Sequence, residues 1–151
     1  MHDIHHFATH FRNAIETALD EGAIDGYKYF RRFPNGCCGE ASNLLAQFLL
    51  DNGISTRYVC GTFYDEFSDD KTPHAWLIAD DMIIIDITGD QFKYDASLKN
   101  DRPVFVEQAD DFYELFEVDE RRDVCEFRGL QFLGDDSLRM LRLYETICSY
   151  L

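Results

Sequence analysis

Apolar side chains recur at intervals of three and four along three stretches of the chain, a spacing typical of helices with one buried face. The first stretch covers residues 3–21. The second covers residues 38–51 and is followed by Gly53, which suits the left-handed position after a helix end. The third begins at about residue 136 and continues to the C-terminus. We predict amphipathic helices over all three, and a further helical segment over residues 24–33.

β-Branched and aromatic residues dominate the middle of the chain and predict strands over residues 54–64, 74–79, 82–88 and 103–107. A tight turn at Asp80-Asp81 joins the second strand to the third. The third strand contains three consecutive isoleucines without alternation, as in a strand that is buried on both faces.

Shorter segments complete the pattern. Pro34-Asn35-Gly36 predicts a turn, residues 65–73 a polar, acidic loop, and residues 110–117 a short helix, whereas residues 118–128 favour neither helix nor strand. Because the predicted helices segregate from the strands, we expect an α+β fold rather than a doubly wound parallel sheet. A central helix would pack on an antiparallel sheet, with flanking N- and C-terminal helices.

Length and composition indicate one domain. The chain has 151 residues, of which 46% are hydrophobic, so it can bury a core without disulfides or metal ions. It contains no internal repeat and no linker rich in Pro, Ser or Gly. We therefore predict a single domain over residues 1–151.

The net charge changes the picture of possible partners. The chain has 14 Lys and Arg against 29 Asp and Glu, a net charge of −15. Nucleic-acid affinity depends on cationic contacts with phosphates, so this charge excludes nucleic acid as a partner and disfavours an anionic membrane surface. The same charge would attract a basic protein, although a solvated acidic surface also explains it.

The chain shows no segment of about 18 uninterrupted apolar residues, the length that a membrane span needs. The N-terminal residues lack the basic flank and apolar run of a signal peptide. The five cysteines are odd in number and form no CxxC motif, which fits neither a disulfide framework nor a zinc knuckle. We therefore expect a reduced, cytoplasmic compartment.

Three segments together predict cysteine chemistry. Cys38 falls on the first turn of a predicted helix, where free amide N–H groups and the helix dipole favour the thiolate. His74 opens a predicted strand, and Asp86 lies near the end of the next. With a hairpin centred between residues 80 and 81, position 74 faces about 87, so Asp86 is one position off direct register with His74. Such an aspartate can orient the imidazole while the other ring nitrogen takes the thiol proton.

These segments resemble the transglutaminase-like family of cysteine enzymes, a branch of the papain-like fold. The matching runs, in order within residues 34–92, are Gly36-Cys37-Cys38-Gly39-Glu40-Ala41-Ser42, Gly53-Ile54-Ser55-Thr56-Arg57-Tyr58-Val59-Cys60-Gly61, His74-Ala75-Trp76 and Asp86-Ile87-Thr88. Four motifs in the family order are far more specific than any one of them. The resemblance implies that Cys38 is the nucleophile, His74 the base and Asp86 the residue that orients it. Ile87 departs from the family, which usually has proline there.

Other residues are weaker candidates. The backbone N–H of Cys38 is the natural first oxyanion donor. The side chains of Asn35 and Gln91 are candidates for a second or for support, although Asn35 is also an ordinary turn residue. Trp76 is a weak candidate for substrate binding and is more easily explained as core. Glu40 needs no catalytic role, and it would oppose thiolate formation if it turned toward Cys38.

The N-terminal histidines could suggest a metal site. His2, His6 and His10 are spaced by four residues, with His5 beside them, a spacing that can place imidazoles around one ion. No carboxylate or cysteine converges with them in the sequence, so we interpret them as a solvated face and expect no metal. The chain also has no GxGxxG, P-loop or HExxH motif, so we expect no cofactor.

The residues together predict a cysteine-dependent acyl-transfer enzyme that forms a thioester with a protein or peptide substrate. Hydrolysis of an amide or peptide, deamidation and transglutaminase-like transfer all fit this chemistry. The alternative is a non-catalytic interaction domain that keeps the fold and binds a basic partner through its acidic surface. The two differ in whether the Cys38 thiol is unusually acidic and within hydrogen-bonding reach of His74.

Overall fold

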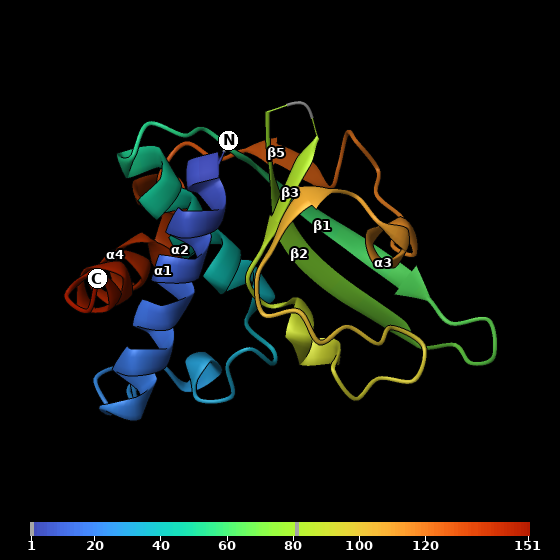
Figure 1. The fold of residues 1–151 in the computed structure, drawn as a ribbon, viewed down its shortest axis with the longest axis horizontal. Coiled ribbons are helices and arrows are strands. Elements are labelled where there is room, and N and C mark those ends of the chain that lie inside the picture. Colours follow the sequence, from blue (N-terminus) through green and yellow to red (C-terminus); the bar gives the residue numbers. More distant parts are fainter. Residues whose placement is uncertain (1, 81) are drawn as a thin grey trace.

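A computed structural model describes residues 2–80 and 82–151, and this part contains four α-helices and five strands (Figure 1). The helices are α1 (His2–Asp20), α2 (Cys38–Asp51), α3 (Asp111–Glu114) and α4 (Ser137–Cys148). The strands are β1 (Arg57–Tyr64), β2 (Lys71–Ala79), β3 (Ile83–Asp86), β4 (Phe105–Gln108) and β5 (Val124–Glu126). The same part contains four short 3₁₀ helices, of which η2 (Gly89–Phe92) follows β3.

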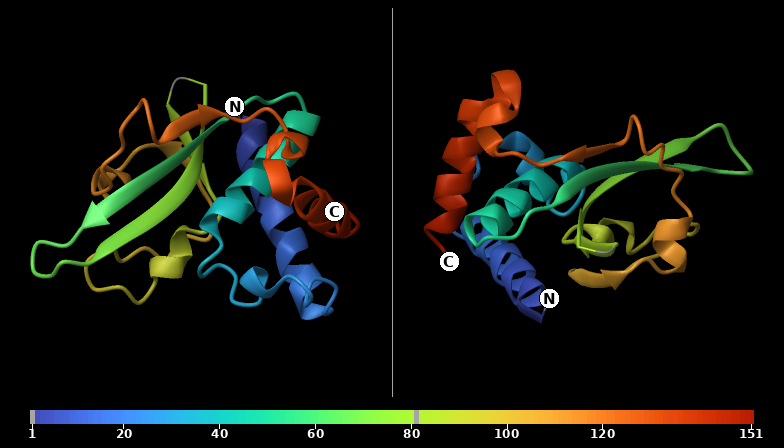
Figure 2. Two further views of the ribbon diagram at one scale, coloured as in Figure 1. Left: turned by 180° about the vertical axis from the view of Figure 1, so that it is seen from behind. Right: turned by 90° about the horizontal axis from the view of Figure 1, so that it is seen from above.

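The strands form one antiparallel sheet in the order β4-β3-β2-β1-β5. Helices α1, α2 and α4 gather on one side of this sheet, and Figure 2 shows the same separation from behind and from above. Helix α2 packs on β2, and the terminal helices α1 and α4 pack together. The α+β class, with its central helix on an antiparallel sheet, is therefore confirmed.

Each face of the sheet carries its own core. Leu77, Ile83 and Ile85 face the three long helices and join their buried apolar side chains in one cluster. Trp76 and Ile84, which alternate with them along the same strands, join an aromatic cluster that includes residues of α3 on the opposite face. Burial on both faces explains why the isoleucines of β3 show no polar alternation.

The end of α2 explains why β1 begins three residues later than predicted. The Gly53 N–H donates to the Leu50 carbonyl at 3.0 Å, and the Ile54 N–H donates to the Leu49 carbonyl at 2.8 Å. Gly53 has φ of 82°, so these two bonds form a Schellman motif. Because the Ile54 N–H is engaged in closing the helix, residues 54–56 are outside the sheet and β1 starts at Arg57.

The predicted helical segment over residues 24–33 is wrong in extent, since only Lys28–Phe30 form a single 3₁₀ turn. Gly26 precedes this turn, and Pro34, which has no N–H to donate, follows it. The residues between them are too few to sustain an isolated α-helix. Phe30 is buried and anchors the segment to the core.

Two other segments differ from the prediction by a few residues. The acidic loop ends at residue 70 rather than 73, because β2 begins at Lys71. The stretch 118–128, for which the sequence predicted neither helix nor strand, contains the edge strand β5. The short helix predicted within residues 110–117 is α3, capped at its start by the Asp110 side chain.

The hairpin between β2 and β3 is centred one half-step further along the chain than predicted. Ala79 pairs with Ile83, and Leu77 pairs with Ile85, each one position later than a centre between 80 and 81 implies. Asp81, one residue of the predicted turn, lies outside the described residues. Because successive side chains of a strand point to opposite faces, this difference decides which face Asp86 occupies. The observed register puts Asp86 on the same face as His74, diagonally across the two strands.

Gly61 lets the aromatic cluster close around this hairpin. It pairs with His74 across β1 and β2. A Cβ atom at position 61 would lie 2.8 Å from Phe116 Cβ and 2.9 Å from Trp76 Cη2, closer than side-chain carbons approach. A glycine is therefore required for the rings to pack against the strand.

Arg12 joins α1 to the segment that follows β3. Its guanidinium is buried and donates to the Ile87 carbonyl at 2.8 Å, to the Pro103 carbonyl at 3.0 Å and to both oxygens of Asp90, at 2.6 and 2.8 Å. It also lies 5.0 Å from the centre of the Phe33 ring. One cation thus holds together the N-terminal helix, the loop before α2 and η2.

We expect Arg12→Met to lower the free energy of unfolding by about 3 kcal/mol or more, because it leaves the half-buried Asp90 carboxylate and two carbonyls without their partner. Urea denaturation followed by circular dichroism measures this loss. Arg142→Met, an exposed change of the same kind on α4, is the control and should shift the free energy by less than about 0.5 kcal/mol. Equal losses in the two variants would show that Arg12 has no structural role.

Candidate active site

His74 and Asp86 form a buried pair on the face of the sheet that carries the aromatic cluster. The His74 Nε2 atom lies 2.7 Å from Asp86 Oδ2. The two residues are 0% and 1% exposed, so water does not screen the interaction. The predicted meeting of these residues across adjacent antiparallel strands is confirmed.

Asp86 has hydrogen-bond donors on both carboxylate oxygens. Oδ1 accepts from the Thr88 N–H at 2.9 Å and from the Thr88 hydroxyl at 3.3 Å. Oδ2 accepts from the Tyr113 hydroxyl at 2.7 Å in addition to His74. Burial raises the pKa of Asp86, but the charge and hydrogen bond of His74, with Thr88 and Tyr113, outweigh it and hold the pKa below its ordinary value. The carboxylate is therefore ionised although it is buried.

Tyr113 is the residue of this group that the sequence did not identify. It lies on α3, and the sequence around it shows only an aromatic stretch within a predicted short helix. Burial, and then the charge and hydrogen bond of Asp86, raise the pKa of the Tyr113 hydroxyl, so it stays protonated and acts as a donor. A buried tyrosine hydroxyl usually has a hydrogen-bond partner, but the sequence alone does not say which.

Aromatic rings enclose the imidazole on its other sides. The ring centres of Trp76, Phe92, Phe112 and Phe116 lie 5.1–6.1 Å from that of His74. Burial lowers the pKa of His74, but the charge and hydrogen bond of Asp86, together with the Cys38 thiol, raise it to about 9. The imidazole is thus protonated at neutral pH while its surroundings are apolar.

Cys38 is the first residue of α2 and is partly exposed. No side chain caps this helix start, where Cys37 occupies the N-cap position. The groups that act on the charge of the thiol are the imidazole of His74 and the backbone N–H of Ala75 on β2. Burial raises its pKa, but the hydrogen bond and charge of His74 and the Ala75 N–H outweigh it, so the pKa of Cys38 lies below its ordinary value of 9.0. A thiolate and an imidazolium are therefore adjacent.

The orientation of the imidazole follows from its partners. Nε2 is engaged by Asp86, which leaves Nδ1 as the nitrogen available to the Cys38 thiol. The side-chain amide of Gln91 also lies here, with its nitrogen 3.1 Å from Nδ1. An amide nitrogen at this distance can donate to Nδ1 only when Nδ1 is unprotonated, because a protonated Nδ1 is itself a donor.

The other predicted residues are distributed as follows. Asn35 is exposed in the loop before α2, and Trp76 is 3% exposed within the aromatic cluster. Glu40 is paired with Arg139 on α4 at 2.9 Å, which directs its carboxylate to that helix. The buried Cys37 differs sharply from Cys38, because burial and the nearby Cys38 and Glu40 raise its pKa to about 12.

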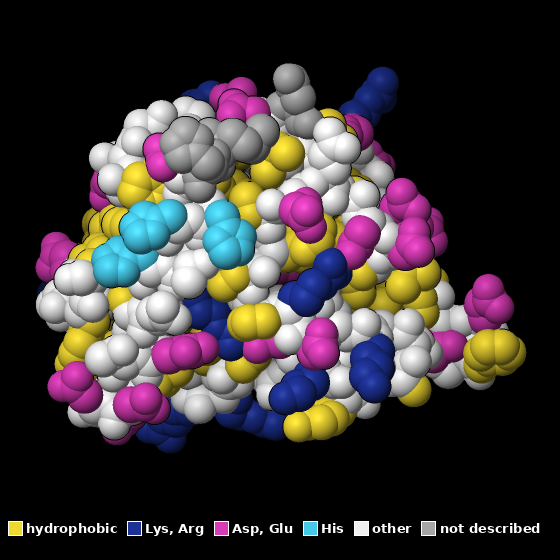
Figure 3. Space-filling view, in the orientation of Figure 1, with side chains coloured by type: hydrophobic (Ala, Val, Ile, Leu, Met, Phe, Trp, Pro, Cys, Tyr) yellow, Lys and Arg dark blue, Asp and Glu magenta, His cyan; other side chains and the backbone are white. Residues whose placement is uncertain are grey.

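The described histidine side chains of α1, those of His5, His6 and His10, are exposed, and cyan side chains gather on this side of the molecule in Figure 3. His6 and His10 stack with ring centres 5.9 Å apart. The side chain of His2 lies outside the described part. Within residues 2–80 and 82–151, no three His, Cys, Asp or Glu side chains converge in a way that could hold a metal ion.

The helices in the described ranges are all too short or too polar to cross a bilayer. All five cysteines have free side chains.

Comparisons of the chain with protein-family models, with curated proteins and with solved structures found no match. The chemistry of the site therefore has to be argued from its residues and their geometry.

The contrast between the adjacent cysteines predicts selective alkylation. At about pH 6, a limiting amount of iodoacetamide should label Cys38 first, because its pKa is lowered while the pKa of Cys37 is raised to about 12. His74→Ala removes the charge partner and should reduce the preference. Peptide mapping by mass spectrometry that resolves the two positions measures it. Preferential labelling of Cys37 would contradict the assignment of Cys38 as the nucleophile.

The coupled pKa shifts also predict how stability depends on pH. The stabilising contribution of His74 is fully present below its unfolded pKa of 6.5 and is lost as pH rises through about 9. Cys38 changes the free energy of unfolding in the opposite direction. Its pKa is lowered in the folded protein, so its stabilising contribution is lost as pH falls through that folded pKa. In the native chain the two slopes oppose each other between pH 6.5 and about 9.

Cys38→Ser removes the cysteine contribution and the smaller part of the His74 shift that comes from the thiol, while the larger part, which comes from Asp86, remains. We therefore expect the free energy of unfolding of this variant to fall more steeply than that of the native chain as pH rises from 6.5 toward 9, by up to about 1.4 kcal/mol per pH unit. Urea denaturation at a series of pH values measures the difference, and Cys60→Ser serves as the control. Parallel curves for the Cys38 variant and the native chain would show that thiol and imidazole are not coupled.

Proposed function

We propose that this protein is a cysteine-dependent acyl-transfer enzyme in which Cys38, His74 and Asp86 form the catalytic triad. One observation carries the proposal: a partly exposed thiol of lowered pKa contacts an imidazole that is itself held by a buried, ionised carboxylate. A thiol that only fills the core needs neither a lowered pKa nor an imidazole with an aspartate behind it.

The first half of the reaction forms the thioester. The Cys38 thiolate attacks the carbonyl carbon of an amide or ester, and a bond forms between sulfur and that carbon. The carbonyl oxygen becomes an oxyanion. When the intermediate collapses, the bond to the leaving nitrogen or oxygen breaks, and the leaving group takes the proton from His74 Nδ1. Asp86 stays ionised and stabilises the imidazolium before this transfer.

The second half releases the acyl group. Neutral His74 takes a proton from water or an amine as that molecule attacks the thioester carbon, and the bond from carbon to sulfur breaks. The products are a carboxylic acid or a new amide, and the thiolate and imidazolium are restored. Water gives hydrolysis or deamidation, and an amine gives transfer. No redox partner or cofactor enters either half.

Backbone N–H groups at the start of α2 are the proposed oxyanion donors. The Cys38 N–H precedes the first hydrogen-bonded turn, and no side chain caps this helix end. Gln91, whose amide lies beside His74 Nδ1, supports the imidazole. It is better placed for this role than Asn35, which is exposed on the preceding loop.

A relationship to a known family of cysteine enzymes is part of the same proposal. A thiol on the first turn of a helix, with histidine and aspartate on the adjacent strands, agrees with the resemblance to transglutaminase-like cysteine enzymes of the papain-like fold. On this basis the substrate is a protein or peptide, and the enzyme acts in a reducing, cytoplasmic environment where the five thiols stay free.

The proposal is tested by trapping the acyl-enzyme from p-nitrophenyl acetate and locating the acetyl group by mass spectrometry. We expect it on Cys38, with no adduct in Cys38→Ser and unchanged labelling in Cys60→Ser, a second partly buried thiol. His74→Ala should slow acylation by about 100-fold or more. Asp86→Asn should do the same, because it removes the charge that stabilises the imidazolium.

Two outcomes would contradict the proposal. Acylation distributed over several thiols, or the same rate in folded His74→Ala, would remove the triad from the reaction. A protein that resists acylation at Cys38 and still binds a basic partner through its acidic surface would instead be the interaction domain named above. Thermal unfolding of each variant establishes that the comparison is made on folded protein.

A further inference from the structure

The loop before the nucleophile has a charge opposite to that of the protein. Residues 26–39 contain no Asp or Glu and carry Lys28, Arg31 and Arg32, in a chain whose net charge is −15. Three of the 14 basic residues therefore lie within five consecutive positions. Screening by salt limits charge interactions between exposed groups to about 10 Å, so the local charge decides what this surface attracts.

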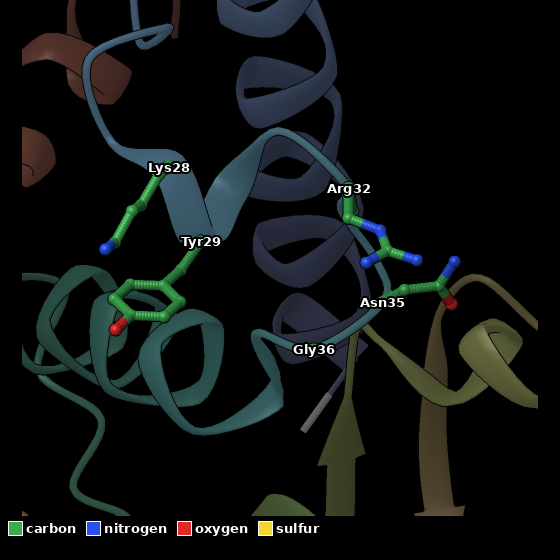
Figure 4. Close-up of a pocket in the computed structure, with 5 residues that line it drawn as sticks. All are labelled: Lys28, Tyr29, Arg32, Asn35 and Gly36. Carbon is green, nitrogen blue, oxygen red and sulfur yellow. The ribbon is translucent and has the colours of Figure 1, made fainter.

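Two of these three basic residues border a hollow of about 460 Å³, which is lined by Lys28, Tyr29, Arg32, Asn35 and Gly36 (Figure 4). Lys28 and Arg32 are exposed, and neither forms an ion pair with an acidic side chain in the described ranges. Arg12 and Arg139, by contrast, are paired with carboxylates. In a chain with 29 acidic residues, the cations at this hollow are left available to a ligand.

The hollow lies next to the proposed nucleophile. Its wall includes Gly36, two residues before Cys38, and two residues of chain span at most about 7 Å. Phe33, on the same loop, packs against Arg12, which is bonded to Asp90 beside Gln91. The loop and η2 are thus fastened to one another near the start of α2. The position of Gly36 in the wall of the hollow is the basis for relating the hollow to a substrate held at Cys38.

We propose that this hollow binds a carboxylate of the acyl donor, so that the preferred substrate is a peptide with an acidic residue next to the acyl group. The proposal rests on the proposed function and specifies its substrate. Arg32 offers a planar pair of donors that fits a carboxylate, and the Asn35 amide beside it can donate a further hydrogen bond (Figure 4). Lys28 and Tyr29 line the other side of the hollow, where Lys28 adds a second positive charge to the surface. The substrate is then acidic at the site, contrary to the basic partner that the net charge suggests.

A pair of matched acyl donors tests this preference. Acetyl-Glu-Gly and acetyl-Gln-Gly p-nitrophenyl esters differ only in the carboxylate. We expect kcat/KM for the Glu ester to exceed that for the Gln ester by about fivefold at low salt, the size of one exposed ion pair, and the ratio to fall as salt is added. The double variant Lys28→Gln/Arg32→Gln should bring the ratio to about one.

The control is Lys71→Gln/Arg121→Gln, which removes two exposed positive charges away from the hollow and should keep the native ratio. Lys71 is matched to Lys28 in its contact, because each lies over a tyrosine ring, at 5.7 and 5.4 Å from the centre. A loss of the ratio in both double variants would attribute the preference to overall charge and overturn the proposal.

A binding measurement separates this proposal from the proposed function. Cys38→Ser is titrated with acetyl-Glu-Gly-amide and acetyl-Gln-Gly-amide, and amide chemical shifts are followed by nuclear magnetic resonance. We expect shifts at residues 28–36 with the Glu peptide, lost in the Lys28→Gln/Arg32→Gln background. If neither ester acylates Cys38, the proposed function fails while this titration still decides the hollow. If Cys38 is acylated but both esters and both peptides behave alike, the carboxylate site is wrong and the acyl-transfer function stands.

Discussion

The fully buried carboxylate of Asp86 is the constraint on which the rest of the site depends. An ion without water must receive hydrogen bonds on both oxygens, or it becomes protonated or destabilises the fold. Asp86 obtains them from His74 on β2, from Thr88 two residues ahead and from Tyr113 on α3. The register of the hairpin, the turn into η2 and the position of α3 are therefore coupled to one charged group.

The carboxylate of Asp86 affects the pKa of the partly exposed Cys38 thiol through the imidazole of His74. Asp86 raises the pKa of His74, and protonated His74 in turn lowers the pKa of the Cys38 thiol. The effect reaches only one of two adjacent cysteines, because Cys37 is buried as the N-cap and its pKa is raised chiefly by that burial. Glu40, the nearest acid along α2, is held by Arg139. Neighbouring thiols thus differ in acidity through contacts rather than through sequence position.

Charge acts at two scales in this molecule. The net charge of −15 describes the whole surface, whereas residues 26–39 form a positive segment beside the start of α2. Since exposed charges interact over about one Debye length, the segment next to a site matters more for its ligand than the total does. Partner chemistry inferred from net charge alone would therefore differ from that inferred from the hollow at Lys28 and Arg32.

The sequence by itself determined the α+β class, the three long helices and the three candidate residues Cys38, His74 and Asp86, because periodicity and turn residues act over short spans of chain. It did not determine where β1 begins, since the Ile54 N–H is used to close α2. Only the tertiary structure decided the face on which Asp86 lies, because a half-step in the hairpin centre reverses it. The tertiary structure also decided that Tyr113, 27 residues along the chain, is the partner of Asp86. A buried hydroxyl and a buried carboxylate each need a partner, but packing selects which groups meet.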